Sequence, residues 1–341
     1  MKNFEFILEA GVNHNGDLKQ ALELVHQASL TGANYIKFQT YSARKLAAKH
    51  SPSYWDLDEE STNSQVELFS KYDGLTKEDY FELAQEASRF GIGFMSTCFD
   101  PEWVDLLDEI MPQYKIASAD ITNFSLIRHI AEKGKKILLS TGASTFSEIT
   151  NAVELIREIS SADISLLHCV LNYPTPASRA ALGRITDLKK SFPNHEIGYS
   201  DHTKPEDSAQ AIQIAYDLGA RVFEKHFTLT PESKGNDHYH SFDTKAAKSV
   251  IRDLQKVDVL TQYTELDFIN NQVAARNFAR RGLYASKDLI VGEIIDESAL
   301  IPLRPPIELD GFGGEQFYAL LGKKIKIQIN AGEPIRSTHV E

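Results

Sequence analysis

The stretch that decides the fold is Glu-Ile-Gly-Tyr-Ser-Asp-His-Thr (Glu196–Thr203), followed after a helix-length interval by Val-Phe-Glu-Lys-His-Phe (Val222–Phe227). Both pieces have the apolar and aromatic content of short β-strands. Between them, Pro205–Leu218 has apolar residues at helical spacing and is closed by Gly219. We therefore expect a strand–helix–strand unit with a histidine at the carboxyl end of each strand. In a parallel α/β sheet, ligands collect at that end.

These two histidines form a candidate metal site. His202 and His226 would come together on neighbouring strands, near Asp201 and Glu224. Imidazole and carboxylate groups in that arrangement could hold a divalent metal ion. A single histidine at a strand end is more often a hydrogen-bonded structural residue. The metal hypothesis therefore depends on both histidines lying at the same level of the two strands in the strand–helix–strand unit.

The same alternation of strands and helices extends back to the N-terminal region. Helices are predicted over Asp17–Thr31 and, with a capping box at its start, over Thr76–Phe90. Eight strand–helix units over about 230 residues indicate an α/β fold of the (β/α)8 TIM-barrel type, here residues 1–262. No Gly-x-Gly-x-x-Gly follows the first strand, which argues against a dinucleotide-binding fold. The expected strands are Phe6–Leu8, Tyr35–Gln39, Gly93–Thr97, Tyr114–Ile116, Lys136–Ser140, Ile164–His168, Glu196–Ser200 and Val222–His226.

The alternation stops near Leu260, and a second, smaller domain follows. Residues 263–280 are polar and predict a linker or connecting helix, and residues 281–341 have short β-rich runs broken by turns. Two of these runs, Leu289–Ile294 and Ile329–Ile335, resemble each other and are both centred on Gly-Glu. A module of about 60 residues has little core of its own, so we expect it to lean on another surface.

Composition limits the classes of function. The net charge is −12, with both signs spread along the chain, which argues against nucleic acid as a partner. Two cysteines imply no disulfide framework and fit a reducing compartment. No run approaches the ~18 apolar residues of a membrane span, and no signal peptide is recognisable. We therefore expect a cytoplasmic protein without membrane attachment.

The segment 42–74 is long for a strand-to-helix connection and carries Tyr54, Trp55 and Phe69. Its length favours a functional loop over the site, although disorder and an oligomer contact remain open as alternatives.

The predicted strand ends carry groups suited to anion binding. Lys37 and Lys115, with nearby Ser and Thr hydroxyls, make a plausible seat for a phosphorylated or carboxylated ligand. The alternative is that both lysines are solvated charges on the outside. Because Lys37 stands between Ile36 and Phe38 on a barrel strand, we favour an inward side chain. Ser140-Thr141-Gly142 is a weaker signal, either an anion-binding turn or the turn before a helix.

Six motifs in order give the chain a family resemblance. The chain resembles the sialic acid synthases, which condense phosphoenolpyruvate with an N-acylated amino sugar, and Arg280–Glu341 is similar to their antifreeze-like (SAF) domain. The resemblance covers essentially the whole chain. The motifs are Glu-Ala-Gly-Val-Asn-His-Asn-Gly (Glu9–Gly16), Ile-Lys-Phe-Gln (Ile36–Gln39), Tyr-Lys-Ile-Ala-Ser (Tyr114–Ser118), Leu-His-Cys…Tyr-Pro-Thr-Pro (Leu167–Pro176), Gly-Tyr-Ser-Asp-His-Thr and Glu-Lys-His-Phe.

The resemblance implies roles for individual residues. His202 and His226 would be metal ligands, normally for Mn²⁺, with Mg²⁺ or Co²⁺ as alternatives. Glu9 matches a carboxylate proposed as a base. Arg304 looks like the arginine that reaches a neighbouring subunit's site, which implies a domain-swapped homodimer. Contacts to phosphoenolpyruvate are implied for Lys37, Thr97, Lys115, Ser118 and Ser200, and contacts to the sugar for Gln39, Tyr173 and Asp237.

Two departures from the family pattern affect the site. Leu171 stands where relatives often have a polar residue, and Asn172 is our candidate to replace that phosphoenolpyruvate contact. The loop after the eighth strand has Asn236 before Asp237, where many relatives have proline. It also has two additional histidines, His238 and His240, which either contact the sugar or are exposed loop residues. The exposed alternative is favoured by a small margin.

The expected activity is a condensation of phosphoenolpyruvate with an N-acetylated amino sugar to a nine-carbon 2-keto acid and phosphate. N-acetylmannosamine and bacterial 6-deoxy diacetamido sugars both remain candidate acceptors. One alternative is another metal-dependent phosphoenolpyruvate–sugar synthase or an aldolase on the same barrel. A second is a non-enzymatic protein that presents the SAF domain for binding, which the presence of the lysines and histidines disfavours.

Overall fold

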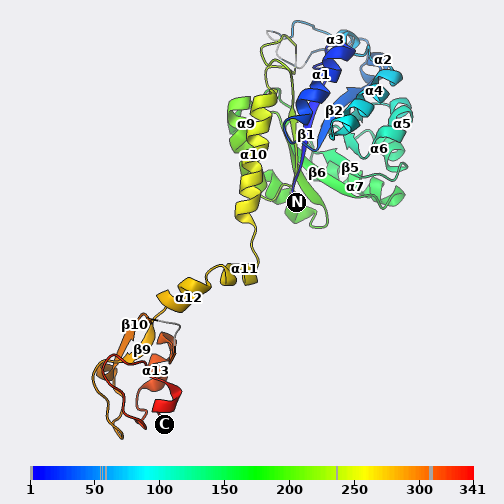
Figure 1. Ribbon diagram of the computed structural model, residues 1–341. Coiled ribbons are helices and arrows are strands. Elements are labelled where there is room, and N and C mark those ends of the chain that lie inside the picture. Colours follow the sequence, from blue (N-terminus) through cyan, green and yellow to red (C-terminus); the bar gives the residue numbers. More distant parts are fainter. Residues whose placement is uncertain (1–2, 54, 56, 58–59, 236, 307–309) are drawn as a thin grey trace. The chain divides into compact units, whose positions relative to one another are not determined.

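The structure is a computed structural model that describes residues 3–341, except 54, 56, 58–59, 236 and 307–309. The chain divides into two compact units, Met1–Leu260 and Thr261–Glu341. In Figure 1 the first unit is coloured from blue to yellow and the second from yellow to red. In the described ranges, no helix is both long enough and apolar enough to cross a membrane.

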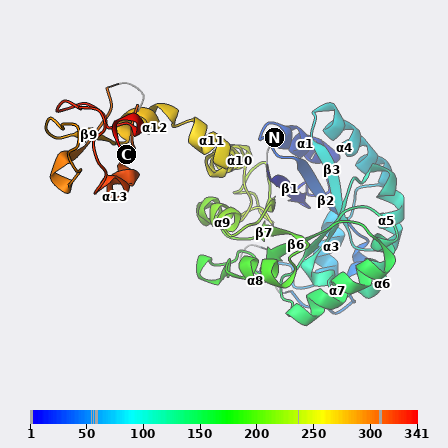
Figure 2. The ribbon, with the colours of Figure 1, turned by 90° about the horizontal axis from the view of Figure 1, so that it is seen from below.

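The first unit is a nearly closed barrel of eight parallel strands, which confirms the predicted TIM-barrel fold. The hydrogen-bonded order is β3-β2-β1-β8-β7-β6-β5-β4. Figure 2 shows the strands as a ring with helices outside them. The strands are β1 (Glu5–Gly11), β2 (Tyr35–Thr40), β3 (Gly93–Cys98), β4 (Tyr114–Ile116), β5 (Ile137–Ser140), β6 (Ile164–Cys169), β7 (Glu196–Asp201) and β8 (Val222–His226).

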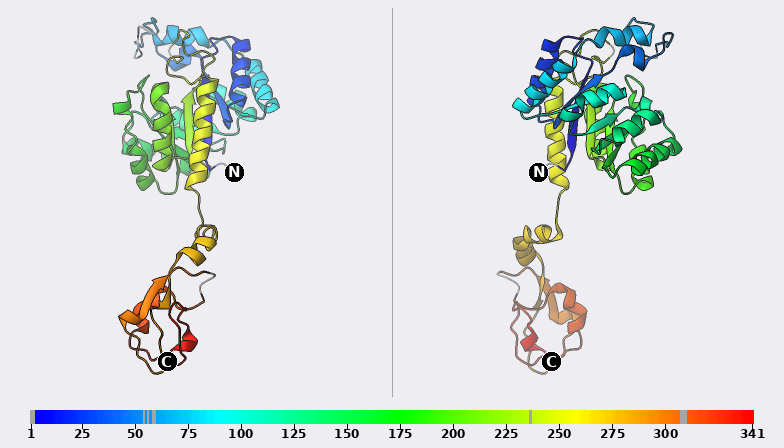
Figure 3. Two further views of the ribbon diagram at one scale, coloured as in Figure 1. Left: turned by 60° about the vertical axis from the view of Figure 1, so that its left-hand side comes forward. Right: turned by 90° about the vertical axis from the view of Figure 1, so that its right-hand side faces the viewer.

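Helices cover the outside of the barrel because each has one apolar face. In α4, Thr76 and Asp79 form the predicted capping box, and Tyr80, Leu83 and Ala87 are buried against the sheet. The long helix α10 lies along the barrel wall (Figure 3). The helices of this unit are α1 (Leu18–Ser29), α2 (Ala43–Leu46), α3 (Gln65–Tyr72), α4 (Lys77–Arg89), α5 (Pro101–Leu107), α6 (Phe124–Ala131), α7 (Phe146–Ile159), α8 (Arg184–Ser191), α9 (Pro205–Asp217) and α10 (Thr244–Thr261).

The barrel interior is layered, because side chains two residues apart on a strand face the same side. One layer is apolar and closes the interior, and its members are Ile7, Met95, Leu138, Leu167 and Val222. Two residues further along the same strands, toward their carboxyl ends, the side chains are polar or ionisable: Glu9, Thr97, Ser140, Cys169 and Glu224. Because side chains alternate with a period of two, the polar layer lies directly above the apolar layer, at the carboxyl ends of the strands.

The segment 42–74 holds two short helices, α2 and α3. The hydroxyl of Ser64 caps α3 by accepting a hydrogen bond from the backbone N–H of Glu67. Trp55 is buried, and its indole N–H donates to the carbonyl of Glu60. Tyr54 lies outside the described residues.

The second unit contains an internal repeat. The similar runs around Gly292 and Gly332 pair with each other, because Leu289 and Ile329 exchange two backbone hydrogen bonds in an antiparallel bridge. Both glycines have positive φ, which the turn requires. The region predicted as a linker or helix is largely helical. The elements are α11 (Glu265–Asn270), α12 (Val273–Ala279), β9 (Gly282–Ala285), β10 (Leu300–Leu303) and α13 (Phe317–Leu320).

Candidate functional site

A cavity of about 530 Å³ opens at the carboxyl ends of the barrel strands. Each of the eight strands contributes a side chain to its lining: Glu9, Lys37, Thr97, Lys115, Ser140, Cys169, Ser200 and Glu224. The segment 42–74 contributes Leu46, Gln65, Leu68, Phe69 and Tyr72 to the lining. Of the alternatives left open for this segment, the structure therefore supports a position at the site.

Lys37 lies on the cavity floor and is held by three groups. Its ammonium nitrogen lies 2.6 Å from Oε2 of Glu9 and 3.5 Å from Oε2 of Glu224, and it donates to the hydroxyl of Thr97 at 2.8 Å. The side chain is 2% exposed. The predicted inward orientation of Lys37 is confirmed, because the outward alternative would leave it solvated.

Glu224 connects the two lysines. One of its carboxylate oxygens, Oε1, lies 3.7 Å from the ammonium nitrogen of Lys115 and accepts a hydrogen bond from Ser200 at 2.8 Å. Burial favours the neutral acid, but Lys115 and Lys37 outweigh it and hold the pKa of Glu224 at about 2. The sequence predicts that Glu224 lies near the histidines but assigns it no role. The available signal was strand alternation, since Glu224 stands two residues before His226.

Glu9 is the carboxylate with the opposite behaviour. Burial raises its pKa to about 6, although Lys37 and hydrogen bonds from Lys37 and Gln39 act against that rise. The amide of Gln39 donates to Oε1 of Glu9 at 2.9 Å. The ladder between β1 and β2 is irregular between Glu9 and Gly11, and such a bulge re-aims the side chains beside it. A carboxylate with a pKa near neutrality can exchange protons at physiological pH.

The wall next to Lys115 offers hydroxyl groups. Ser118 accepts a hydrogen bond from the backbone N–H of Gly142 at 2.9 Å. Ser140 is buried, and its hydroxyl has no hydrogen-bond partner among the described residues. Both residues line the cavity. The end of β5 therefore gives the cavity an unpaired donor, the hydroxyl of Ser140, which the sequence indicated only weakly.

His202 has one ring nitrogen committed to the backbone. Its Nδ1 lies 2.8 Å from the carbonyl oxygen of Val170, the geometry of an N–H donating to that carbonyl, which would leave Nε2 as the acceptor nitrogen. The ring packs against Tyr173 at 4.3 Å between centroids and lies 5.3 Å from the ring of His226. The two histidines predicted to come together therefore do so.

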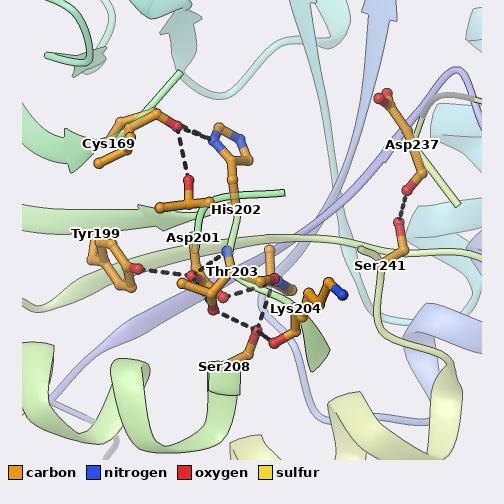
Figure 4. A network of polar contacts seen from close by, with 12 residues as sticks. Cys169, Tyr199, Asp201, His202, Thr203, Lys204, Ser208, Asp237 and Ser241 are labelled. Atoms are coloured by element: carbon orange, nitrogen blue, oxygen red, sulfur yellow. Dashed lines mark hydrogen bonds and ion pairs between the residues drawn. The ribbon is translucent and has the colours of Figure 1, made fainter. Parts of the chain in front are cut away.

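Asp201, which the sequence placed near these histidines, faces elsewhere. It forms an ion pair with Lys225 at 2.9 Å, and both side chains are fully buried. Tyr199 and Thr203 donate to its Oδ1 (Figure 4). Strand alternation explains this, because Asp201 and His202 point to opposite sides of the sheet.

The loop after β8 brings a third histidine to the pair. His226, Asp237 and His240 each offer a ligand atom, and these atoms lie within 4.8 Å of one another. Burial lowers the pKa of His226 and of His240 well below the ordinary value, so both rings are neutral and can donate a lone pair. This donor set suits a divalent metal ion of the first transition row.

The expectation that His238 and His240 are exposed is wrong. His238 is 3% exposed, and its Nδ1 lies 2.7 Å from the hydroxyl of Thr228. His240 is fully buried. The loop folds inward because Phe242 pairs with Phe227 beyond the end of β8 and donates its N–H to the carbonyl of His226. Asn236 lies outside the described residues.

The structure does not bring every predicted residue to the cavity. Leu171 and Tyr173 line it, whereas Asn172 is exposed, and its carbonyl accepts a hydrogen bond from the hydroxyl of Thr175. Arg304 is exposed on the second unit and precedes the buried Pro305. The remaining predicted residues, Glu9, Lys37, Gln39, Thr97, Lys115, Ser118, Ser200, His202, His226 and Asp237, all line the one cavity.

Known proteins resemble the chain over most of its length. An N,N'-diacetyllegionaminic acid synthase of Campylobacter jejuni is 35% identical, over 95% of this chain and 97% of the relative. A pseudaminic acid synthase of Helicobacter pylori is 32% identical over 99% and 98%. The solved structure of an N-acetylneuraminic acid synthetase of Leptospira borgpetersenii in complex with citrate has a TM-score of 0.68 and 29% identity, over 80% of this chain and 92% of that one.

Two family models match separate parts of the sequence. The SAF domain matches residues 280–341, the β-rich part of the second unit. The NeuB family matches residues 24–265, which include seven of the eight barrel strands and most of the residues that line the cavity. With the full-length relatives above, these matches show that the chain belongs to the NeuB family.

Proposed function

We propose that the protein condenses phosphoenolpyruvate with the open-chain form of an N-acetylated amino sugar, giving a nine-carbon 2-keto acid and phosphate. Support comes from relatives named as legionaminic and pseudaminic acid synthases and from the cavity at the barrel mouth. The observation that carries the proposal is the pair of buried lysines, Lys37 and Lys115, facing the same cavity as His202 and His226.

The lysines are suited to a substrate with two anionic groups. In the free protein their ammonium groups are balanced by Glu9 and Glu224. The phosphate and carboxylate of phosphoenolpyruvate would join that network and accept hydrogen bonds from Thr97, Ser118 and the unpaired hydroxyl of Ser140. Charge-assisted bonds of this kind fix the enol carbon over the sugar aldehyde.

The reaction forms one carbon–carbon bond and breaks one carbon–oxygen bond. C3 of phosphoenolpyruvate attacks the aldehyde carbon, whose oxygen takes up a proton and becomes a hydroxyl. Water adds at C2, and Glu9 takes a proton from it, as its pKa of about 6 allows. The C2–O bond to phosphate then breaks, phosphate leaves with its bridging oxygen and takes up the proton of the new C2 hydroxyl, and the 2-keto group remains.

His202 and His226 would hold a divalent metal ion, for which we propose Mn²⁺, and the bound ion would supply Lewis-acid polarisation of the aldehyde oxygen. Tyr173 lies against the ring of His202, and Asp237 lies 3.7 Å from Nδ1 of His226. These contacts, and the hydrogen bond from Gln39 to Glu9, support our proposal that all three residues contact the sugar.

The acceptor that we propose is a 6-deoxy diacetamido sugar rather than N-acetylmannosamine, because part of the cavity lining is apolar. It includes the side chains of Leu46, Leu68, Phe69 and Phe99. A sugar with a terminal methyl group and a second acetamido methyl would bury apolar surface there, whereas the free hydroxyls of N-acetylmannosamine would lose hydration. Tyr41 lines the cavity and its buried hydroxyl has no described partner, which supports a hydrogen bond from it to an acetamido carbonyl.

The family resemblance supports three further elements of the proposal. The chain is organised as a barrel domain over 1–262, a linker over 263–280 and an SAF domain over 281–341. It forms a domain-swapped homodimer in which the exposed Arg304 reaches the partner's cavity. The protein works in the cytoplasm, which its two free, buried cysteines fit.

The test is a panel of acceptors. Purified protein is incubated with phosphoenolpyruvate, Mn²⁺ and either N-acetylmannosamine, 2,4-diacetamido-2,4,6-trideoxyhexoses or phosphorylated hexoses, and the keto acids are identified by mass spectrometry. Phosphoenolpyruvate labelled with ¹⁸O at the bridging position should give labelled phosphate. Turnover of phosphorylated sugars lacking an N-acyl group would instead favour another synthase or an aldolase on the same barrel.

A further inference from the structure

His240 is a buried ionisable residue for which the proposed condensation has no use. Its side chain is fully buried, and neither ring nitrogen has a hydrogen-bond partner among the described residues. A neutral imidazole carries one N–H donor and one acceptor nitrogen. Leaving both unsatisfied in the interior is costly, so buried polar groups in proteins are nearly always paired.

The nearest polar groups are themselves metal-ligating types. The ring of His240 lies 4.7 Å from the ring of His226 and 6.3 Å from that of His202, between centroids. Nδ1 of His226 is also buried without a hydrogen-bond partner, and it lies 3.7 Å from Oδ2 of Asp237. Three unpartnered ring nitrogens therefore converge beside one carboxylate.

The ligand atoms of His226, Asp237 and His240 all lie within 4.8 Å of one another, and the ring of His202 lies beside this group. The pairwise distances between ring centroids among His202, His226 and His240 are 5.3, 4.7 and 6.3 Å.

The chain holds His240 firmly in this position. Ser241, the next residue, donates to the carbonyl of Asp237 and accepts from the side-chain amide of Asn13, which also donates to the carbonyl of Phe227. These hydrogen bonds hold the loop from Asp237 to Phe242 against the ends of β1 and β8. A ligand on a loop that is already ordered loses little conformational entropy when the ion binds.

We propose that His240 is a ligand of the metal ion, so that the centre in this chain contains the imidazoles of His202, His226 and His240 together with the carboxylate of Asp237. Imidazole-rich sites favour Zn²⁺, Co²⁺ and Fe²⁺, whereas sites rich in carboxylate and water favour Mg²⁺ and Mn²⁺. The third imidazole therefore shifts the preference of this protein toward the nitrogen-preferring ions. The alternative is that His240 is a packing residue that contacts Tyr173 and Tyr239.

The inference concerns the same site as the proposed function, but its test uses the metal alone. Affinities for Co²⁺ and Mn²⁺ are measured by calorimetry on the metal-free full chain, and the visible absorption of the Co²⁺ complex is recorded. The variants are His240→Phe, which keeps a ring but no ligand, and His240→Asp, which keeps a ligand but replaces nitrogen by oxygen. His238→Gln, on the same loop, is the matched control.

We expect His240→Phe to weaken Co²⁺ binding about 100-fold and Mn²⁺ binding about 10-fold, with a changed Co²⁺ spectrum. His240→Asp should bind Mn²⁺ as well as the native chain does, while its preference for Co²⁺ over Mn²⁺ falls at least about tenfold. His238→Gln should retain both affinities. An unchanged spectrum and affinity ratio in both His240 variants would overturn the proposal, and would leave the condensation untouched. The proposal would also be overturned if a His240 variant lost Co²⁺ affinity and Mn²⁺ affinity by the same factor while its thermal unfolding matched that of the native chain.

Discussion

The ammonium nitrogen of Lys37 lies 2.6 Å from Oε2 of Glu9, and both side chains are almost fully buried. This contact couples the residue proposed to bind phosphoenolpyruvate to the residue proposed as a base. Burial raises the pKa of Glu9, and the charge of Lys37 offsets part of that rise. Binding of the anion and readiness of the base therefore depend on the same ion pair.

Replacing either lysine should weaken the use of phosphoenolpyruvate far more than metal binding. A buried charge-assisted contact contributes about 2–3 kcal/mol, so kcat/KM for phosphoenolpyruvate in Lys37→Met or Lys115→Met should fall about 30- to 150-fold. Steady-state kinetics and metal titration on each variant measure the two effects. Lys136→Met is a suitable control, because Lys136 pairs with Glu196 at the opposite ends of the strands. Native kinetics in both test variants would contradict the proposed anion site.

Glu9 should produce an acidic limb in the activity profile. As a base it must be ionised, so kcat/KM should fall as the pH drops through about 6, and Glu9→Gln should abolish most of the activity. If the Glu9→Gln variant had native rates and its kcat/KM fell at the same acidic pH, Glu9 would be excluded as the base.

The same residue has an effect on stability with a defined sign. Its pKa is raised from 4.5 to about 6 in the folded state, so the folded protein binds the proton more tightly than the unfolded chain. The contribution of Glu9 to folding is therefore present below pH 4.5 and is lost as the pH rises through about 6, a change of about 2 kcal/mol. The unfolding free energy of the native chain, measured relative to Glu9→Gln, should decrease over this interval and be level above it. A difference that rises with pH would contradict the assignment.

Most of what the sequence predicts correctly about the barrel and its site rests on the alternation of side chains along the strands. It placed Lys37 inside, and seven of the eight predicted strands begin and end within one residue of those observed. The exception is β1, which spans Glu5–Gly11 instead of the predicted Phe6–Leu8. Strand alternation also predicts which of the two acidic residues, Asp201 or Glu224, lies on the same face as the histidines. Asp201 is adjacent to His202 and must face away from it, whereas Glu224 is two residues before His226 and must share its face.

The loop after β8 could not be predicted in the same way. Its residues have no regular period, and their burial depends on contacts with Asn13 and Phe227, which are distant in the sequence. His240 therefore looked like an exposed polar residue although it is fully buried. Asn172 is also in a turn that strand alternation does not describe, where it is exposed and its carbonyl oxygen accepts a hydrogen bond from Thr175.

The two strand-end histidines should be needed for metal binding. His202→Ala and His226→Ala each remove a proposed ligand, so each should lower metal content and activity by at least about tenfold while the fold is kept. Atomic spectroscopy of the purified variants and circular dichroism measure metal and fold. His195→Ala, whose histidine bonds the carbonyl of Ile164 away from the cavity, serves as the control. Full metal occupancy in either test variant would show that the site lies elsewhere.

Tyr41 should affect the acceptor and leave phosphoenolpyruvate unaffected. Its hydroxyl is buried beside the cavity, so Tyr41→Phe removes a donor without changing the shape of the wall. One hydrogen bond of about 1 kcal/mol predicts a KM for the diacetamido sugar about fivefold higher. In Tyr114→Phe, which loses a hydroxyl bonded to Asp108 outside the cavity, the KM for the sugar should be native. Equal changes in the KM of both substrates would indicate a general disturbance of the barrel.

Arg304 should act on the cavity of a second subunit. It is exposed and stands before Pro305 and Pro306, which restrict the backbone and reduce the entropy lost when the guanidinium is placed. If the second unit serves the partner's barrel, an inactive His202→Ala chain and an inactive Arg304→Ala chain should complement each other. In the mixed dimer, the barrel of the Arg304→Ala chain is intact and receives Arg304 from the other chain. After random exchange of subunits, about a quarter of the native activity should return. A mixture of His202→Ala with Lys37→Met is the control, because both defects lie in the barrel and no intact cavity forms. Confirmed exchange with no recovery, or a fully active monomer, would show that Arg304 does not act in trans.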